Sequence, residues 1–327
     1  MPSINDTVSE MVQPVLPQYA GAPGQIHGGR MMEWIVTAGT MAASRVARST
    51  VVLGAMDDID FLHPVKVGEI AILRAQVEYV GRTSLEVGVR VYAENPVTGS
   101  RAVTLSSHLV FVSVDEHANP RPVAQKIEPR GRQEEVLVQA ARERREHRLA
   151  RFALKAEKLK EVQDDPDPPR WRFESTRIVL PEEALFGSFM FAGKLLMGID
   201  EAGGILCVRY TRGSSMTASM DALDFYSPLR VGDIITLRAG LNHVGRTSME
   251  VGVKVLAEER FTGEVRHTCT AFLTFVHLGP DRRPKPAPAF NPESPGERRR
   301  WEATLLRREA RLARVKRLKA AIAGEGG

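Results

Sequence analysis

The chain has 327 residues, of which 43% are hydrophobic and 26% are charged. This apolar content suffices for the cores of two ordinary domains and excludes a globally disordered chain. The formal charge is +5, the N-terminus has no basic segment followed by an apolar run, and the most apolar stretch, residues 187–199, contains Lys194. We therefore expect no signal peptide, no membrane-spanning helix and a cytoplasmic protein.

The sequence contains only two cysteines, Cys207 and Cys269. Their spacing matches neither a disulfide framework nor a metal site, so we interpret them as small buried hydrophobic residues. His63 and His108 form no recognisable metal motif, and we expect no metal.

The sequence repeats itself at an offset of 164 residues. Gly-Arg-Thr-Ser at 81–84 returns at 245–248, and the same offset pairs Phe111 with Phe275. Each copy is longer than a solenoid repeat of about 20–50 residues, so the copies are expected to be complete domains. The predicted division is a first domain at 11–125, a basic helix and Pro-rich linker at 126–175, a second domain at 176–285, and a basic helix at 296–323.

The first copy begins with a predicted short strand over 11–16 and a turn that contains Pro and Gly. A helix is then predicted over 29–45, because apolar residues recur at i, i+3 and i+4 spacing. Alternating apolar and polar residues predict the strands that follow, with a hairpin turn at 95–99. These strands are expected at 51–61, 69–80, 83–94 and 101–114.

The second copy repeats this order, with a strand over 176–180, a helix over 193–203 or slightly longer, and a hairpin at 260–264. One long helix followed by an antiparallel meander predicts an α+β domain in which the sheet wraps the helix. Because such a helix covers one face of one sheet, the two domains are expected to pair their sheets edge to edge.

Basic residues concentrate in 130–160 and 298–319. The first segment is predicted to form an amphipathic helix over 130–162 that stops at the Pro-rich residues 164–169. The second ends the chain, and residues 324–327 are expected to fray. Both segments also carry many Glu residues and lack interleaved aromatic residues, which favours a solvated or inter-subunit helix over a nucleic-acid site.

The two copies differ at a few positions where chemistry could occur. Val36 in the first copy corresponds to Asp200 in the second. Conversely, polar or small residues of the first copy face larger apolar ones in the second: Gln25, His27 and Gly28 correspond to Phe189, Phe191 and Ala192. A duplicated scaffold that changes these positions indicates a single shared site.

Three segments in the same order resemble the acyl-CoA thioesterases of the hotdog fold: residues 24–29 before the helix, residues 60–68, and residues 80–84. The tandem arrangement with charged C-terminal helices is similar to the two-domain acyl-CoA hydrolases, among them the brain-type long-chain enzyme. The resemblance implies a tandem double hotdog that hydrolyses acyl-CoA to a carboxylic acid and CoA. Its substrate would be the CoA thioester, with no further cofactor, and three tandem chains would form a hexamer-like ring.

The resemblance also implies which residues form the site. The acidic residue would be Asp200 on the helix of the second domain, and the amide would be Gln25 in the first domain, where the family often has Asn. The reverse cleft would need an acid at Val36 and an amide at Phe189, and it has neither. One working cleft and one inactive cleft are therefore predicted.

Chemistry assigns each residue a role beside a simpler alternative. Asp200 is a general base or a nucleophile, or else a solvent-facing helix residue. Gln25 holds the water or the carbonyl, or is a turn residue. The N–H groups of Gly28 and Gly29 stabilise an oxyanion at a helix N-terminus, or these glycines only permit a tight turn. His27 acts directly, or it supports the turn through hydrogen bonds.

The repeated tetrapeptide supplies candidate CoA-binding residues, which are Arg82, Thr83, Ser84, Arg246, Thr247 and Ser248. Because both copies keep them, hairpin geometry explains them as well as phosphate binding does. Two other functions stay open: a non-catalytic acyl-CoA-binding or sensing protein, and an enoyl-CoA hydratase. Asp200 opposite Gln25 argues against a sensor, and the lack of a nearby His in the second copy argues against a hydratase.

Overall fold

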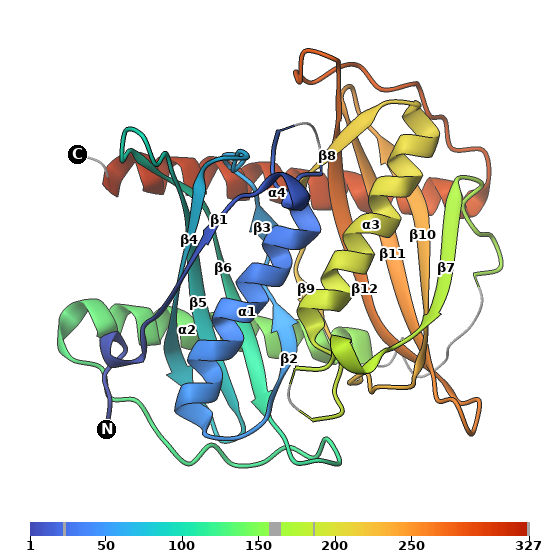
Figure 1. Cartoon of the computed structure of the whole chain (residues 1–327). Coiled ribbons are helices and arrows are strands. Elements are labelled where there is room, and N and C mark those ends of the chain that lie inside the picture. Colours follow the sequence, from blue (N-terminus) through green and yellow to red (C-terminus); the bar gives the residue numbers. More distant parts are fainter. Residues whose placement is uncertain (22–23, 157–164, 186, 326–327) are drawn as a thin grey trace.

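Two helix-and-sheet units lie side by side in the computed structural model, which describes residues 1–21, 24–156, 165–185 and 187–325 (Figure 1). In each unit a long helix lies against one face of a curved antiparallel sheet. A further charged helix follows each unit in the chain. The predicted α+β architecture of a tandem double hotdog is confirmed.

The first unit has a 20-residue helix, α1, followed by a meander of strands. Its elements are η1 (Asn5–Thr7), β1 (Ser9–Pro14), η2 (Pro17–Tyr19), α1 (Gly28–Ala47), β2 (Val51–Met56), β3 (Ile59–Asp60), β4 (Ile70–Val80), β5 (Ser84–Glu94) and β6 (Arg101–Ser113). Helix α2 (Gly131–Ala156) follows it.

The second unit repeats this order and ends in helix α4 (Pro295–Glu325). Its elements are β7 (Arg172–Ile178), η3 (Pro181–Glu183), α3 (Ala192–Thr211), β8 (Ser214–Met220), β9 (Leu223–Asp224), β10 (Ile234–Val244), β11 (Ser248–Glu258) and β12 (Val265–Leu278). None of the helices within the described residues is both long and apolar enough to cross a bilayer.

Helix α3 extends eight residues past Gly203, where the sequence suggested an end, to Thr211. Glycine often ends helices, but Gly203 has a packing role here. A Cβ at this position would lie 2.7 Å from the ring of Phe275. The helix ends instead at Arg212, which adopts a left-handed conformation with φ of 54°.

The predicted strand over 51–61 is wrong in one respect, because the chain changes sheets within it. Strand β2 belongs to the first sheet, in the order β1-β4-β5-β6-β2-β9, and β3 belongs to the second, in the order β3-β8-β12-β11-β10-β7. Ala55 pairs with Asp224, and Asp60 pairs with Ser219. These two pairs are equivalent at the offset of 164, so the sheets are joined by reciprocal exchange of short strands.

Helices α2 and α4 bind carboxylates on both units through arginines. On α2, Arg144 and Arg148 pair with the first unit, and Arg151 reaches Asp224 of the second at 2.6 Å. On α4, Arg311 pairs with the second unit at Asp221 (2.8 Å), and Arg314 reaches Asp60 of the first at 2.6 Å. Each helix therefore packs against its own unit and forms an ion pair with the other unit.

Candidate active site

Asp200 lies at the junction of the two units, with 1% of its surface exposed. It projects from α3 toward the N-terminus of α1. The backbone N–H of Gly29 donates a hydrogen bond to its Oδ2 at 2.7 Å, and the hydroxyl of Thr217 donates to its Oδ1 at 2.7 Å. The first N–H groups of a helix have no partner within the helix and attract negative charge. The start of α1 therefore holds the carboxylate of α3.

Glycine at positions 28 and 29 makes this approach possible. A Cβ on Gly28 would lie 2.6 Å from the Thr217 side chain and 3.2 Å from Oδ2 of Asp200. A Cβ on Gly29 would lie 3.0 Å from both Asp200 and Met197. A side chain at position 28 would collide with Thr217 of β8, and one at position 29 would press against α3, so these glycines have a steric role that a tight turn alone would not require.

His27 is the residue before α1, and its ring lies beside the carboxylate. Its Nδ1 is 3.4 Å from Oδ2 of Asp200, which is longer than an ordinary hydrogen bond. The backbone N–H of His27 donates to Tyr19 at 2.8 Å, and its carbonyl accepts from Met31 at 3.1 Å. The backbone of His27 thus supports the turn, while its imidazole faces the acid.

Burial raises the pKa of the Asp200 carboxyl above its ordinary value. The nearby His27, the Thr217 hydroxyl and the Gly29 N–H each act in the opposite direction, because they favour the charged form. A carboxylate whose pKa is raised is a better proton acceptor than an ordinary aspartate near neutral pH.

A cavity of about 580 Å³ opens next to this carboxylate. Its polar end contains His27, Gly28, Asp200 and Thr217, and its apolar wall contains Ile205, Val208, Met216 and Phe275. Within the described part of the chain, Gln25 does not line this cavity. Its side-chain oxygen is buried and has no hydrogen-bond partner among the described residues.

The equivalent place on the other side of the pseudo-twofold axis is almost filled. The cavity there measures about 30 Å³. Its lining residues correspond to those of the active-site cavity at the offset of 164. Val36 occupies the position of Asp200, Leu53 that of Thr217, Phe191 that of His27 and Leu185 that of Gly21. Larger apolar side chains have therefore replaced the acid, the hydroxyl and the space.

The candidate CoA-binding residues lie in the β4–β5 and β10–β11 turns. The N–H of Gly81 donates to the carbonyl of Ser84 at 2.8 Å, and the N–H of Gly245 donates to that of Ser248 at 2.7 Å. The carbonyl of Thr83 accepts from the N–H of Ser113 on β6, and the carbonyl of Thr247 accepts from the N–H of His277 on β12, each at 2.9 Å. These bonds account for the turns. Binding of CoA by Arg82, Arg246 and their neighbours stays a prediction.

The sequence analysis missed Thr217. The sequence could have identified Thr217, because the offset of 164 pairs it with Leu53. This is the same change from an apolar to a polar residue that identified Asp200. It also missed Glu33, a buried acid on α1 that pairs with Lys194 of α3 at 2.9 Å and ties the two helices together. Among the described residues, no group of three His, Cys, Asp or Glu side chains is placed to hold a metal ion.

Comparison with known proteins gives consistent matches in both copies. The model of the thioesterase superfamily matches residues 23–100 and again residues 187–263. Mouse acyl-coenzyme A thioesterase 11 is 30% identical over 326 residues, which are 95% of this chain and 54% of that protein. The chain thus spans about half the length of this relative.

A second relative and one solved structure are also similar to this chain. The mouse cytosolic acyl coenzyme A thioester hydrolase is 29% identical over 305 residues, which cover 88% of this chain and 78% of the relative. The crystal structure of an apo-hexameric acyl-CoA thioesterase is 36% identical with a TM-score of 0.44. It matches 46% of this chain and 97% of its own chain.

Proposed function

Because this chain belongs to the thioesterase superfamily, we propose that it hydrolyses acyl-CoA to a carboxylic acid and CoA at the junction of its two units. One observation carries the proposal. Asp200, buried on α3, accepts a hydrogen bond from the N–H of Gly29 at the start of α1 beside an open cavity, whereas the equivalent cleft has Val36 and almost no space.

In the proposed reaction, Asp200 takes a proton from a water molecule as the water oxygen adds to the thioester carbon. The negative charge that develops on the carbonyl oxygen is stabilised by the helix N-terminus. Since the N–H of Gly29 holds the carboxylate, we assign the oxyanion to the N–H of Gly28. The C–S bond then breaks, and the thiolate recovers the proton from Asp200.

Direct attack by Asp200 is the second route. The carboxylate would displace the thiolate to form a mixed anhydride, and water would then add to the carboxyl carbon of Asp200, which releases the acid product with an oxygen from Asp200. A single turnover in isotopically labelled water separates the two routes. With a general base the label enters the acid product at once, whereas with a nucleophile the first product carries an unlabelled oxygen from Asp200.

A panel of short-, medium- and long-chain acyl-CoA substrates, with detection of the free thiol, tests the activity. We expect turnover of at least one acyl class and its loss in the Asp200→Asn variant. Binding of acyl-CoA without turnover would favour the sensing alternative. Hydration of an enoyl-CoA without thiol release would favour a hydratase.

We also propose a trimer of tandem chains and a cytosolic location, in keeping with the relatives named hexameric and cytosolic. Light scattering tests the first point, because a monomeric mass of about 36 kDa would exclude a trimer. Arg311 and Arg314 of α4 bind carboxylates within the chain, which supports the expectation that this helix has no nucleic-acid partner.

A further inference from the structure

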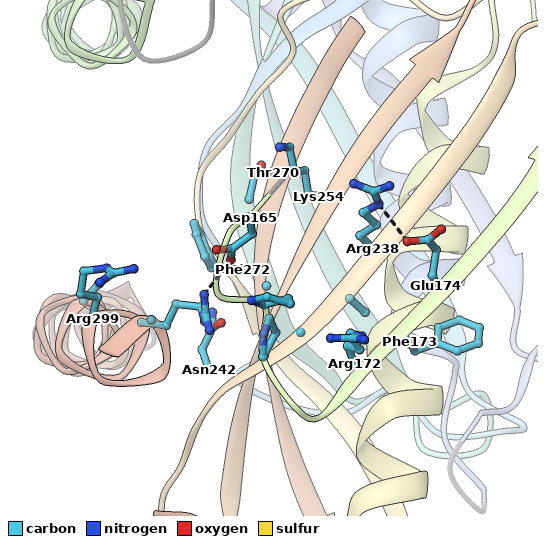
Figure 2. Close-up of a pocket in the computed structure, with 18 of the residues that line it drawn as sticks. Asp165, Arg172, Phe173, Glu174, Arg238, Asn242, Lys254, Thr270, Phe272 and Arg299 are labelled. Carbon is cyan, nitrogen blue, oxygen red and sulfur yellow. Dashed lines mark hydrogen bonds and ion pairs between the residues drawn. The ribbon is translucent and has the colours of Figure 1, made fainter. Parts of the chain in front are cut away.

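A cavity of about 1110 Å³ lies on the second unit between β7, the outer face of the sheet and α4. Its basic lining residues come from five elements: Arg172, Arg209, Arg238, Lys254, Arg299, Arg300 and Arg307. The acidic lining residues are Asp165 and Glu174. Figure 2 shows Arg172, Arg238 and Lys254 on the strands and Arg299 on α4, on opposite sides of this space. Such a surface favours a ligand with several negative charges.

Arg209 connects this basic cavity to the candidate active site, because it lines both cavities. It lies nine residues after Asp200 on α3, which is about 13.5 Å farther along the helix axis. The residues between them that line the active-site cavity include Gly204, Ile205 and Val208. The guanidinium of Arg209 stands over the ring of Phe173, 5.0 Å from its centre. The two cavities therefore share Arg209, which lies between the active-site cavity and the edge strand β7.

The first unit has a different surface at the equivalent place. Gly240, Asn242 and Phe272 of the basic cavity correspond to Gln76, Glu78 and His108 at the offset of 164. Glu78 accepts a hydrogen bond from Gln76 at 3.3 Å and pairs with Arg144 of α2 at 2.7 Å. In the first unit a buried acid, Glu78, thus stands where the wall of the cavity in the second unit has the uncharged Asn242. The basic cavity belongs to the same unit as Asp200.

From this geometry we infer that the basic cavity binds the phosphorylated nucleotide end of the CoA thioester, with Arg209 and Arg172 as phosphate contacts. The inference rests on the proposed function. The cavity beside Asp200 is too small for a whole acyl-CoA, so the pantetheine arm must carry the nucleotide out of it. Along α3 the arm meets Arg209, which lines both cavities, and then the basic cavity. Guanidinium groups bind phosphate oxygens in pairs, which suits this end of the molecule.

Steady-state kinetics of the full chain tests the inference. Arg209→Gln and Arg172→Gln should each raise KM for an acyl-CoA about tenfold, as expected for loss of a charged hydrogen bond, with kcat nearly unchanged. Arg172→Gln, which lies outside the active-site cavity, should hydrolyse the matching N-acetylcysteamine thioester, which has no nucleotide, as well as the parent protein does. Arg209→Lys should recover part of the loss. Arg45→Gln, at the equivalent position of α1, is the matched control and should leave KM unchanged.

Two further measurements separate the rival explanations. Adenosine 3′,5′-bisphosphate should inhibit competitively against acyl-CoA, whereas non-competitive inhibition would indicate a separate effector site and overturn the inference. The nucleotide would lie at the β10–β11 turn instead if Arg246→Gln raised KM for acyl-CoA but not for the N-acetylcysteamine thioester, and Arg209→Gln raised neither.

Calorimetric titration with CoA itself keeps this test independent of catalysis. Weaker CoA binding by Arg209→Gln supports the inference even if no thioester is hydrolysed, in which case the proposed function alone fails. Equal affinity of Arg209→Gln and the parent protein for CoA overturns the inference whatever the activity.

Discussion

The carboxylate of Asp200 and the backbone N–H of Gly29 are 171 positions apart in the chain and 2.7 Å apart in space. This hydrogen bond joins the middle of one helix to the start of the other. It makes the site a product of both copies, since neither copy contains the acid and the glycine pair together. The predictions that follow test how this junction works.

The Asp200→Asn variant should lose activity and gain stability. Removal of the proton acceptor should lower kcat by about 10²- to 10⁴-fold. Asn is nearly isosteric and can still accept from Gly29 and donate to Thr217, so the site should stay assembled.

The gain in stability follows from the raised pKa of Asp200. Its folded pKa lies above its unfolded value, so the native state binds the proton more tightly. The free energy of unfolding therefore falls as the pH rises from the pKa of Asp200 in the unfolded chain, about 3.9, to its pKa in the folded protein. Above the folded pKa the whole loss of stability from the buried charge is present. Thermal unfolding should show a higher Tm for Asp200→Asn at pH 7 and a smaller difference near pH 3. A lower Tm at pH 7 would contradict this account.

The Thr217→Val variant should move the pH dependence of the reaction. The Thr217 hydroxyl lowers the pKa of Asp200 through its hydrogen bond to Oδ1. Without it the pKa of the carboxyl rises further, so the acid limb of kcat/KM should shift to higher pH. We expect recovery of much of the lost activity at alkaline pH. An unchanged acid limb would show that Asp200 is not the group that titrates.

Sequence periodicity predicted the helices and most strands, because alternation and helical spacing are local properties. The exchange at Asp60 could not be predicted in this way, since its partner, Ser219, lies in the other copy. The extent of α3 was obscured by Gly203, whose role is to admit the ring of Phe275. Comparison of the two copies identified Asp200 without any structure. The same comparison at Leu53 and Thr217 would have extended the site.

The Gly28→Ala variant tests the close approach of the start of α1 to Thr217 of β8. The added methyl would collide with the Thr217 side chain and displace it from Asp200. A misplacement of this size should lower kcat about 10²-fold with little effect on folding. The second copy has Ala192 at the equivalent position, so alanine itself is compatible with the start of this helix. The reciprocal variant, Ala192→Gly, is the control and should keep full activity.

The Val36→Asp variant tests whether the filled cleft can be reactivated. Val36 is 1% exposed, and the position that would supply a hydroxyl is Leu53. An unpaired carboxylate here should cost about 3–5 kcal/mol of stability and add no activity. Pairing it with Leu53→Thr should recover about 1–2 kcal/mol, measured by urea unfolding, because a hydrogen bond then compensates the charge. A rise in kcat for the single variant would contradict the assignment of one working cleft.

The last prediction concerns the arginine of α4 that binds the first unit at the junction of the two sheets. Arg314 of α4 binds Asp60 through two nitrogens, at 2.6 and 3.1 Å, exactly where β3 joins the second sheet. Arg314→Leu leaves Asp60 buried and unpaired, so the free energy of unfolding should fall by about 3–5 kcal/mol. Arg101→Leu, which removes an exposed pair with Glu94, should cost about 1 kcal/mol or less. Asp200 and Gly29 meet at this junction. We therefore expect the Arg314→Leu variant to lose its thioesterase activity at urea concentrations that leave the circular dichroism of the variant unchanged. Coincident loss of activity and secondary structure would show that this ion pair stabilises the whole chain and not the junction.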